Sequence, residues 1–131
     1  MNKLETVQAI YAAFGSGDIP GIIEYLHPDV EWEYDMQDHG IPWLVARRGR
    51  ESVVGFFQTL AAIEFKRFEP RELLENEHQV MATISVEFTM RASGREVKDF
   101  EAHLFTFDES GRVTRFRHFV DTHQHWLAAN E

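Results

Sequence analysis

The sequence predicts an α+β fold in which a curved antiparallel sheet wraps against three helices from the N-terminal half of the chain. Apolar residues recur at helical spacing in three stretches before residue 62. Apolar and polar residues then alternate at the period of a strand, most regularly over residues 79–90. Turn-forming residues at 108–111 separate two runs rich in Phe, Val and Thr, the pattern of a hairpin. Because the helices come before the run of antiparallel strands, they should cover one face of the sheet.

The composition fits one domain that spans residues 1–131. With 131 residues, 44% hydrophobic and 13% aromatic, the chain can bury a core without cross-links. The absence of cysteine excludes disulfides, thiolate nucleophiles and zinc fingers. A net charge of -9 with scattered basic residues argues against nucleic acid as a partner. No apolar run could span a membrane and no secretion signal opens the chain, so we expect a cytoplasmic protein without a membrane partner.

The N-terminal half carries the signals of three helices. Asn2 and Glu5 form a capping box ahead of the first apolar-periodic stretch. Asp18 caps a second helix, which should end at residues 27–28. A third helix is predicted over about 50–62. The inward-facing residues predicted for the first and third helices are Leu4, Val7, Ile10, Tyr11, Phe14, Val53, Val54, Phe57, Leu60 and Ala61.

A first strand and a long loop separate the second and third helices. Val30, Trp32 and Tyr34 alternate with acidic residues at 31, 33 and 35, which indicates a strand with an apolar inner face and an acidic outer face. Residues 35–50 are mostly irregular, and Trp43 within them is either exposed or covers another group. Later in the chain, Pro70 should confine a strand near residues 64–74 to an edge of the sheet.

The stretch 99–121 is the most informative about function. With a four-residue loop at 108–111, Glu101 lies opposite His118 and His103 lies opposite Phe116. Side chains alternate along a strand, so one face then carries a carboxylate across from an imidazole in aromatic surroundings. The residues predicted to share this face are Asp99, Glu101, His103, Phe105, Thr114, Phe116, His118 and Val120.

Three segments in this order resemble a known superfamily. GDIPGIIEYLHPDVEWEY, GRESVVGFF and FTFDESGRVTRFRHFVD are similar to the nuclear-transport-factor-2-like superfamily, in particular its SnoaL-like and ketosteroid-isomerase-like branch. The resemblance covers nearly the whole chain. It implies a cone-shaped pocket between the helices and the concave sheet face, with the hairpin face looking into it. The superfamily contains isomerases, dehydratases, cyclases, epoxide hydrolases and non-catalytic binding domains, so the resemblance implies no single reaction.

Residue-by-residue comparison with that branch shows departures. Tyr34, Ile10 and His103 stand where a ketosteroid isomerase would have its proton-abstracting aspartate, its main oxyanion tyrosine and its protonated aspartate. The mechanism of that enzyme is therefore not expected. SnoaL-like polyketide cyclases are more similar, since they use a histidine and an aspartate on the two hairpin strands. The resemblance implies that His103 matches the histidine and that His118 takes roughly the place of the aspartate.

The predicted hairpin face suggests acid–base chemistry. Imidazole titrates near neutrality and can both accept and donate a proton. A carboxylate on its other nitrogen fixes the tautomer, and Glu101 is the candidate for this role beside His118. His118 would then remove a proton next to a carbonyl, and His103 would hydrogen-bond the enolate. The same groups could instead form a self-satisfied polar pair. They could also bind a metal, but no ligand spacing indicates one, and no metal is expected.

Other residues are expected to contact a small apolar ligand. Trp32 and Tyr34 face inward on the first strand, although alternating aromatic residues are also typical of a core. Trp43 is a core or lid candidate, whereas His123 and His125 are assigned to a solvent-facing tail. The predicted pocket residues are Trp32, Tyr34, Trp43, Phe57, Asp99, Phe105, Phe116 and Val120.

Three functions remain open at this point. The first is a cofactor-independent isomerase, cyclase or dehydratase that acts on an apolar carbonyl compound through Glu101, His103 and His118. The second is a non-catalytic domain that binds a small hydrophobic ligand, and the third is a dimeric interaction module. The outer face of the hairpin has an apolar centre and a basic margin, so we expect a homodimer through it. The residues of this face are Phe100, Ala102, Leu104, Arg115, Arg117 and Phe119.

Overall fold

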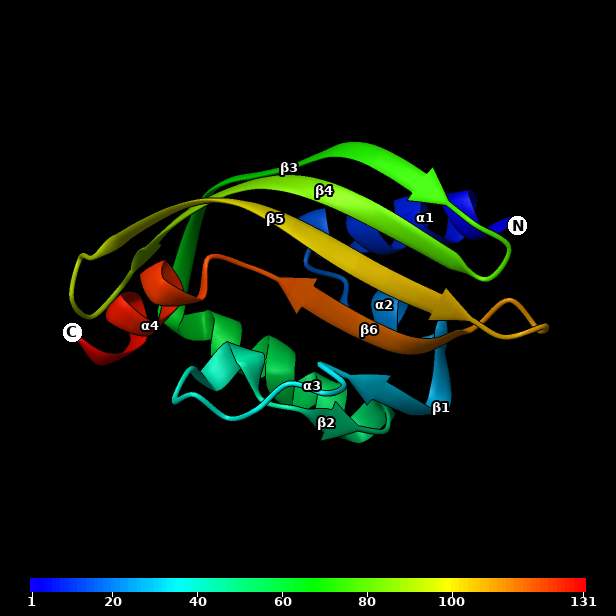
Figure 1. Cartoon of the computed structure of the whole chain (residues 1–131), viewed down its shortest axis with the longest axis horizontal. Coiled ribbons are helices and arrows are strands. Elements are labelled where there is room, and N and C mark those ends of the chain that lie inside the picture. The colour runs from blue at the N-terminus through cyan, green and yellow to red at the C-terminus, as the bar shows by residue number, and fades with distance from the viewer.

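A six-stranded curved sheet forms the centre of the molecule, and helices cover its concave face (Figure 1). The computed structural model describes all 131 residues. The strand order is β2-β1-β6-β5-β4-β3, and every neighbouring pair is antiparallel except β1 and β6, which are parallel. The predicted fold class is therefore confirmed. The elements are α1 (Lys3–Gly15), α2 (Ile19–Ile23), β1 (Leu26–Trp32), η1 (Pro42–Leu44), β2 (Arg47–Arg48), α3 (Arg50–Thr59), η2 (Leu60–Ala62), β3 (Ile63–Glu75), β4 (Gln79–Met90), β5 (Glu96–Phe107), β6 (Val113–Phe119) and α4 (Thr122–Asn130).

The helices begin where the capping signals predict. The side chain of Asn2 accepts a hydrogen bond from the Glu5 amide at 2.8 Å, and the Glu5 carboxylate accepts one from the Asn2 amide at 2.9 Å, which completes the capping box. Helix α2 is shorter than predicted, because β1 already begins at Leu26 and pairs there with Val113 of β6. Tertiary strand pairing thus overrides the helical periodicity of this segment. The predicted buried face of α3 is partly wrong: Val54, which was expected inside, is 37% exposed, and Phe56, which was not, is buried.

The strand that contains Pro70 lies at an edge of the sheet, as predicted. β3 pairs only with β4, and the register of that pair shifts between Pro70 and Glu72. Proline has no amide hydrogen to donate, so an edge position removes the cost of the missing ladder bond. The regular alternation of β4 is also confirmed, since buried and half-buried residues alternate along its whole length.

The alternation predicted for β1 breaks after Trp32. Glu33 and Asp35 both have left-handed backbone conformations, with φ of 57° and 61°. Glu33 is consequently turned inward and has 0% exposure, although the pattern assigns it to the acidic outer face. The prediction that Tyr34 faces the pocket is wrong. Its ring lies on the outside, where the Arg115 guanidinium stacks over it at 3.9 Å from the ring centroid.

The β5–β6 hairpin has a different register from the predicted one. Phe107 pairs with Val113 and Thr106 pairs with Arg115, so Thr114 is an extra residue in a bulge. The loop therefore has five residues, 108–112, and Asp108 organises it by accepting hydrogen bonds from the amides of Ser110 and Arg112. The predicted pairing of Glu101 with His118 is wrong, and His103 is the residue across from His118.

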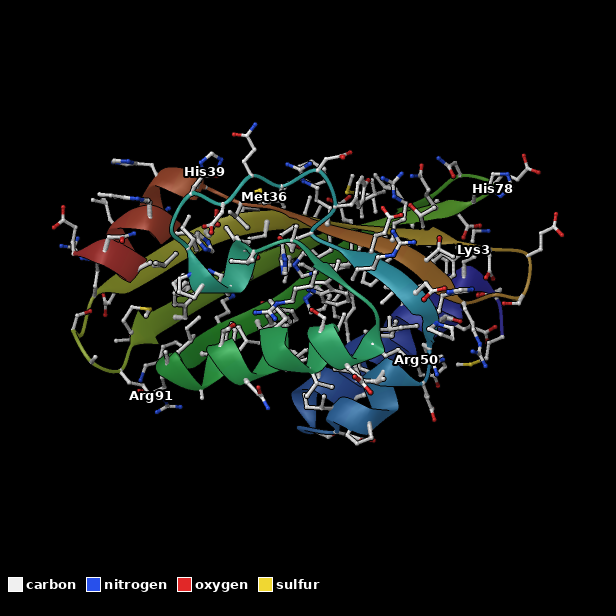
Figure 2. The ribbon with its side chains drawn as sticks, turned by 90° about the horizontal axis from the view of Figure 1, so that it is seen from below. Lys3, Met36, His39, Arg50, His78 and Arg91 are labelled. Atoms are coloured by element: carbon white, nitrogen blue, oxygen red, sulfur yellow. The ribbon has the colours of Figure 1, made fainter.

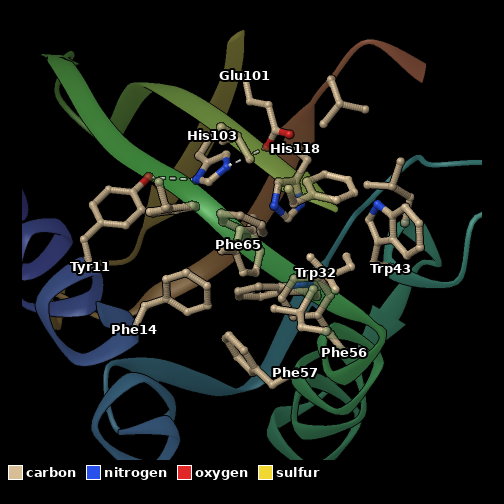
Figure 3. A pocket seen from close by; sticks show the side chains of 18 of the residues that line it. Tyr11, Phe14, Trp32, Trp43, Phe56, Phe57, Phe65, Glu101, His103 and His118 are labelled. Atoms are coloured by element: carbon tan, nitrogen blue, oxygen red, sulfur yellow. Dashed lines mark hydrogen bonds and ion pairs between the residues drawn. The ribbon is translucent and has the colours of Figure 1, made fainter. Parts of the chain in front are cut away.

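Relative to the predicted register, the partners of β5 on β6 are displaced by two residues. Most of the residues predicted for the inner face therefore remain on it. His103, Phe105, Phe116 and His118 still point toward the helices, as Figure 3 shows for the two histidines. Thr114 leaves this face, and its hydroxyl donates to the Thr106 carbonyl at 3.2 Å.

Opposite faces of the sheet differ in what they expose. The helices α1, α2 and α3 lie on one side, and the loop with Met36 and His39 passes along the other (Figure 2). On the outer face, Phe100 is 63% exposed and Phe119 is 44% exposed. These residues belong to the surface for which the sequence predicts a homodimer, and the dimer stays a prediction. No helix combines the length and the apolar composition that a membrane crossing requires.

Candidate active site

An apolar pocket lies between the concave face of the sheet and the helices. It encloses about 700 Å³ of atom-free space, including its open mouth, and 18 of its 22 lining residues are hydrophobic. Phe14, Phe57, Phe65 and Phe68 line both this pocket and a neighbouring open groove, and we take the side that they share as the mouth. Of the predicted pocket residues, Trp32, Trp43, Phe57, Phe105, Phe116 and Val120 line this pocket, as do Glu101, His103 and His118, whereas Tyr34 and Asp99 do not.

His118 and Glu33 form a buried dyad at the inner end of the pocket. Nδ1 of His118 lies 2.7 Å from Oε1 of Glu33, and the same oxygen accepts the His118 backbone amide at 2.9 Å. The His118 side chain is 12% exposed, and its ring points into the pocket (Figure 3). A carboxylate bonded to Nδ1 holds the proton on that nitrogen, so Nε2 of the neutral ring carries a lone pair for a ligand.

Sequence reasoning missed Glu33 because alternation places it outside. Its inward direction depends on a left-handed conformation that costs of the order of 1–3 kcal/mol for a residue other than glycine. The backbone amide of Glu33 donates to the Phe116 carbonyl at 2.8 Å, which anchors this strained residue beside β6. No sequence pattern marks such a residue. Only the pairing of β1 with β6 brings the carboxylate to His118.

His103 lies next to His118 and has a different environment. The rings meet edge to face with centroids 4.5 Å apart. Nδ1 of His103 is 2.8 Å from the Tyr11 hydroxyl, and Nε2 is 3.6 Å from Oε1 of Glu101 (Figure 3). The nearby carboxylate favours a proton on Nε2, so the Tyr11 hydroxyl donates to Nδ1. His103 Nε2 is buried without a hydrogen-bond partner, which leaves a donor available to a ligand oxygen.

Tyr11 is the second residue that sequence reasoning did not assign to the site. The pattern placed it on the buried face of α1, and the resemblance put Ile10 at the oxyanion position. Burial, reinforced by the charge of Glu101, raises the pKa of Tyr11 well above its ordinary value of 10.0. Its hydroxyl therefore remains protonated and able to donate to His103 throughout the physiological pH range.

The two pocket histidines have pKa values shifted in opposite directions. Burial lowers the pKa of His118, but the charge of Glu33 and the hydrogen bond to it outweigh burial, so the pKa lies above 6.5. Burial and the charge of His118 lower the pKa of His103, and contact with Glu101 does not compensate. Adjacent groups with separated pKa values are suited to different roles in proton transfer. His118 is the stronger base, and His103 remains neutral.

A second buried histidine cluster, centred on His125, also borders the pocket. Nε2 of His125 is 2.9 Å from Oδ2 of Asp99 and 3.2 Å from Oε2 of Glu101. Nδ1 of His125 accepts the indole N–H of Trp43 at 2.9 Å. The prediction that His125 faces solvent is wrong, because α4 folds back over the sheet and leaves the residue 2% exposed. Trp43 is likewise buried.

Electrostatics in this second cluster favour a charged histidine beside two carboxylates. Burial lowers the pKa of His125, but hydrogen bonds to Asp99 and Glu101 outweigh it and raise the pKa to about 9. Burial raises the pKa of Glu101, but contacts with His103 and His125 dominate and lower it well below its ordinary value. The Trp43 N–H opposes protonation of His125, because an indole nitrogen can only donate and the charged ring has no lone pair to offer.

Two sets of donor atoms lie close enough together to consider a metal ion. The ligand atoms of Glu101, His103 and His118 lie within 4.8 Å of one another, and so do those of Asp99, Glu101 and His125. Two histidines and a carboxylate are a known set for divalent transition metals. In the second set, however, the histidine nitrogen is already hydrogen-bonded to both carboxylates. That set satisfies itself without an ion.

Solved structures with the same fold support the architecture. A crystal structure of an NTF2-like protein of unknown function from Burkholderia pseudomallei K96243 matches with a TM-score of 0.85 and 24% identity, covering 100% of this chain and 99% of that chain. TerC co-crystallised with polyporic acid matches with a TM-score of 0.81 and 25% identity, over 98% of both chains. A candidate polyketide cyclase from Pseudomonas putida KT2440 matches with a TM-score of 0.80 and 18% identity, also over 98% of both chains.

The class of protein is therefore an NTF2-like α+β domain with an apolar pocket and a polar inner end. The family model described as "SnoaL-like domain" matches residues 7–116, and the chain belongs to this family. The family match and the similarity to solved NTF2-like structures both confirm the predicted resemblance. Among curated proteins, the search found no match.

Proposed function

We propose that the protein is a cofactor-independent enzyme that carries out acid–base chemistry on an apolar carbonyl compound. The observation that carries this proposal is the Glu33–His118 dyad, whose Nε2 faces an apolar pocket beside the unpartnered Nε2 of His103. A dyad with one nitrogen held and the other free has the geometry of a general base. Glu33 replaces Glu101 as the carboxylate partner that the sequence analysis assigned to His118.

Each polar residue at the inner end has a role in this proposal. Nε2 of His118 takes a proton from the carbon next to the carbonyl, and Glu33 stabilises the resulting imidazolium. The Nε2–H of His103 donates to the oxygen on which negative charge develops, while Tyr11 holds the His103 tautomer. Return of the proton from His118 to another atom completes an isomerisation. Loss of a leaving group instead gives elimination, and attack on a second carbonyl gives cyclisation.

The lining of the pocket supports an apolar, aromatic or polycyclic substrate. Phenylalanines form the mouth, and Trp32 stacks on Phe116 inside with ring centroids 4.0 Å apart. Ionisable groups of the lining gather around Glu101, His103 and His118, so the substrate should bind with its carbonyl oxygen toward these residues. The match to TerC, which was crystallised with polyporic acid, makes that compound a reasonable member of the first ligand panel.

Proton exchange in heavy water tests the proposal without knowledge of the natural substrate. The probe is 2-tetralone, an apolar bicyclic ketone, and NMR follows the replacement of its α-protons by deuterium. We expect the protein to accelerate exchange, and His118→Ala to reduce the acceleration by about 10²–10⁴-fold. His78→Ala is the matched control, because the His78 side chain is 68% exposed and does not line the pocket.

The outcome also separates catalysis from binding alone. A ligand that binds only the folded state raises the melting temperature. If 2-tetralone or polyporic acid raises the melting temperature but no α-proton exchanges, the alternative of a non-catalytic ligand-binding domain replaces the enzyme. If the His78 and His118 variants lose exchange equally, the dyad has no special role.

A further inference from the structure

The hydrogen-bonded pairing of β5 with β6 ends before the two strands reach the inner end of the pocket. Their ladder ends at the pair Ala102 and Phe119, while β5 continues along β4 as far as the pair Glu96 and Thr89. After Phe119 the chain turns away into α4, and the gap between the two strands is visible in Figure 1. A second cavity, here called the rear cleft, lies in this gap, bounded by β5 residues 99–102, β6 residues 117–119 and the turn 120–122.

The rear cleft is polar and large enough for water. It has about 910 Å³ of atom-free space including its open side, compared with about 700 Å³ for the apolar pocket. Only 5 of the cleft's 12 lining residues are hydrophobic, and Arg117, Asp121 and Thr122 contribute polar side chains. Nε of Arg117 is buried without a protein partner, which water in the cleft would satisfy.

The two cavities meet at the proposed catalytic groups. Glu101, His118 and Val120 line both of them. The apolar pocket approaches these residues from the helix side. The rear cleft reaches them from the outer face, where Thr83 and Ala102 also line it. His118 and Glu101 thus stand between an apolar cavity and a polar one.

We propose that the rear cleft is the route by which water reaches His118 and by which its ring protons exchange with solvent, separate from the phenylalanine mouth that admits the apolar ligand. This deepens the proposed function, and its catalytic consequence rests on that function. In the ligand-free site, water that enters through the cleft reaches the Nε2 edge of the ring; when imidazolium His118 releases its proton, the Nε2–H bond breaks and this water accepts the proton as hydronium. The site is therefore suited to reactions that exchange, release or consume water at the substrate.

The experiment measures water exchange of the His118 ring N–H protons by NMR on protein labelled with ¹⁵N-histidine, without any ligand. The signals are assigned by their loss in His118→Gln. Ala102→Leu adds bulk to the rear cleft from the outer face, and we expect it to slow the exchange about tenfold. Ala61→Phe narrows the groove at the apolar mouth, and we expect it to leave the exchange rate within about twofold of wild type.

A matched control separates closure of the cleft from general stiffening of the sheet. Leu104→Phe adds bulk to the same face of β5, next to the cleft but outside its lining, and should leave the exchange unchanged. Unaltered His103 and His125 shifts in each variant establish that the site is intact. If Ala61→Phe slows exchange and Ala102→Leu does not, water enters by the mouth and the proposal is overturned. Equal rates in all variants would overturn it as well.

The readout is independent of turnover, so the two proposals fail separately. Absence of 2-tetralone exchange with slow water exchange in Ala102→Leu would reject the enzyme and retain the water route. The reverse pattern would retain the enzyme and reject the route.

Discussion

The protein contains two buried histidine–carboxylate clusters that differ in how many nitrogen atoms they use. In His118, only Nδ1 is held, by Glu33, and the ring edge with Nε2 faces the pocket. In His125, both nitrogens are engaged, Nδ1 by Trp43 and Nε2 by Asp99 and Glu101. Burial and a nearby carboxylate are common to both, so neither property distinguishes a reactive histidine from a structural one. What distinguishes His118 is the ring nitrogen that no protein group holds.

Each cluster also joins different parts of the chain. The His118 dyad connects the end of β1 to β6, next to each other in the sheet. The His125 cluster ties α4 and the loop with Trp43 to β5, and Asn130 adds a hydrogen bond to the Gly40 carbonyl at 3.1 Å. We therefore expect changes at His118 to act on chemistry and changes at His125 to act on stability.

The largest expected effect comes from exchanging the two histidines one at a time for glutamine. His118→Gln should reduce proton exchange of 2-tetralone by about 10²–10⁴-fold, because an amide cannot act as a base. His125→Gln should keep most of that activity and instead lower the free energy of unfolding, because it leaves Asp99 and Glu101 without their shared donor. Urea unfolding and exchange assays on both variants check the contrast. Equal activity losses would abolish the distinction between the clusters.

Removing the carboxylate of the dyad is expected to have the next largest effect. Glu33→Gln should lower the pKa of His118, measured by NMR titration, because the charge and the hydrogen bond that raise it are lost. Breaking a buried ion pair on one side costs about 3–5 kcal/mol of stability in general. Glu101→Gln should lower the same pKa less, since Glu101 acts on His118 only through its charge. A larger shift in the Glu101 variant would restore the partner expected from the sequence.

The pH dependence of stability should identify the His125 cluster. The pKa of His125 rises from 6.5 to about 9 on folding, so its contribution is fully present below pH 6.5 and is lost as the pH rises toward 9. Glu101, with a lowered pKa, contributes above its ordinary value of 4.5 and loses this as the pH falls. His103, with a lowered pKa, destabilises the fold as the pH drops below 6.5. Urea unfolding from pH 6.5 to 9 should show a decline, to which His118 with its raised pKa also contributes, and this decline should be weaker in His125→Gln. An identical decline in both proteins would assign it to other groups.

The smallest effect is expected from the indole donor. Trp43→Phe keeps an aromatic ring but removes the N–H that points at Nδ1 of His125. The neutral ring then loses a hydrogen bond and the charged ring loses an unfavourable neighbour, so the pKa of His125 should rise further. We expect a loss of about 1 kcal/mol in unfolding free energy. A lower His125 pKa in this variant would show that the indole does not donate to Nδ1.

Local patterns in the sequence determined the elements and most of the inner face. The Asn2–Glu5 capping box, the edge position of Pro70 and the alternation of β4 depend on neighbouring residues, and each was predictable. The pocket position of His103 and His118 was also predictable, because a shift of two residues keeps a side chain on the same face of a strand.

Only the tertiary structure decided which groups meet at the site. The bulge at Thr114 set the register, and the left-handed conformation at Glu33 brought that residue to His118. The return of α4 buried His125 beside Asp99. The contacts of Glu33 and His125 join residues that are distant in the chain, and the one at Glu33 depends on backbone strain that the packed sheet maintains. Periodicity describes one element at a time, so it contains no information about contacts that form only when several elements pack together.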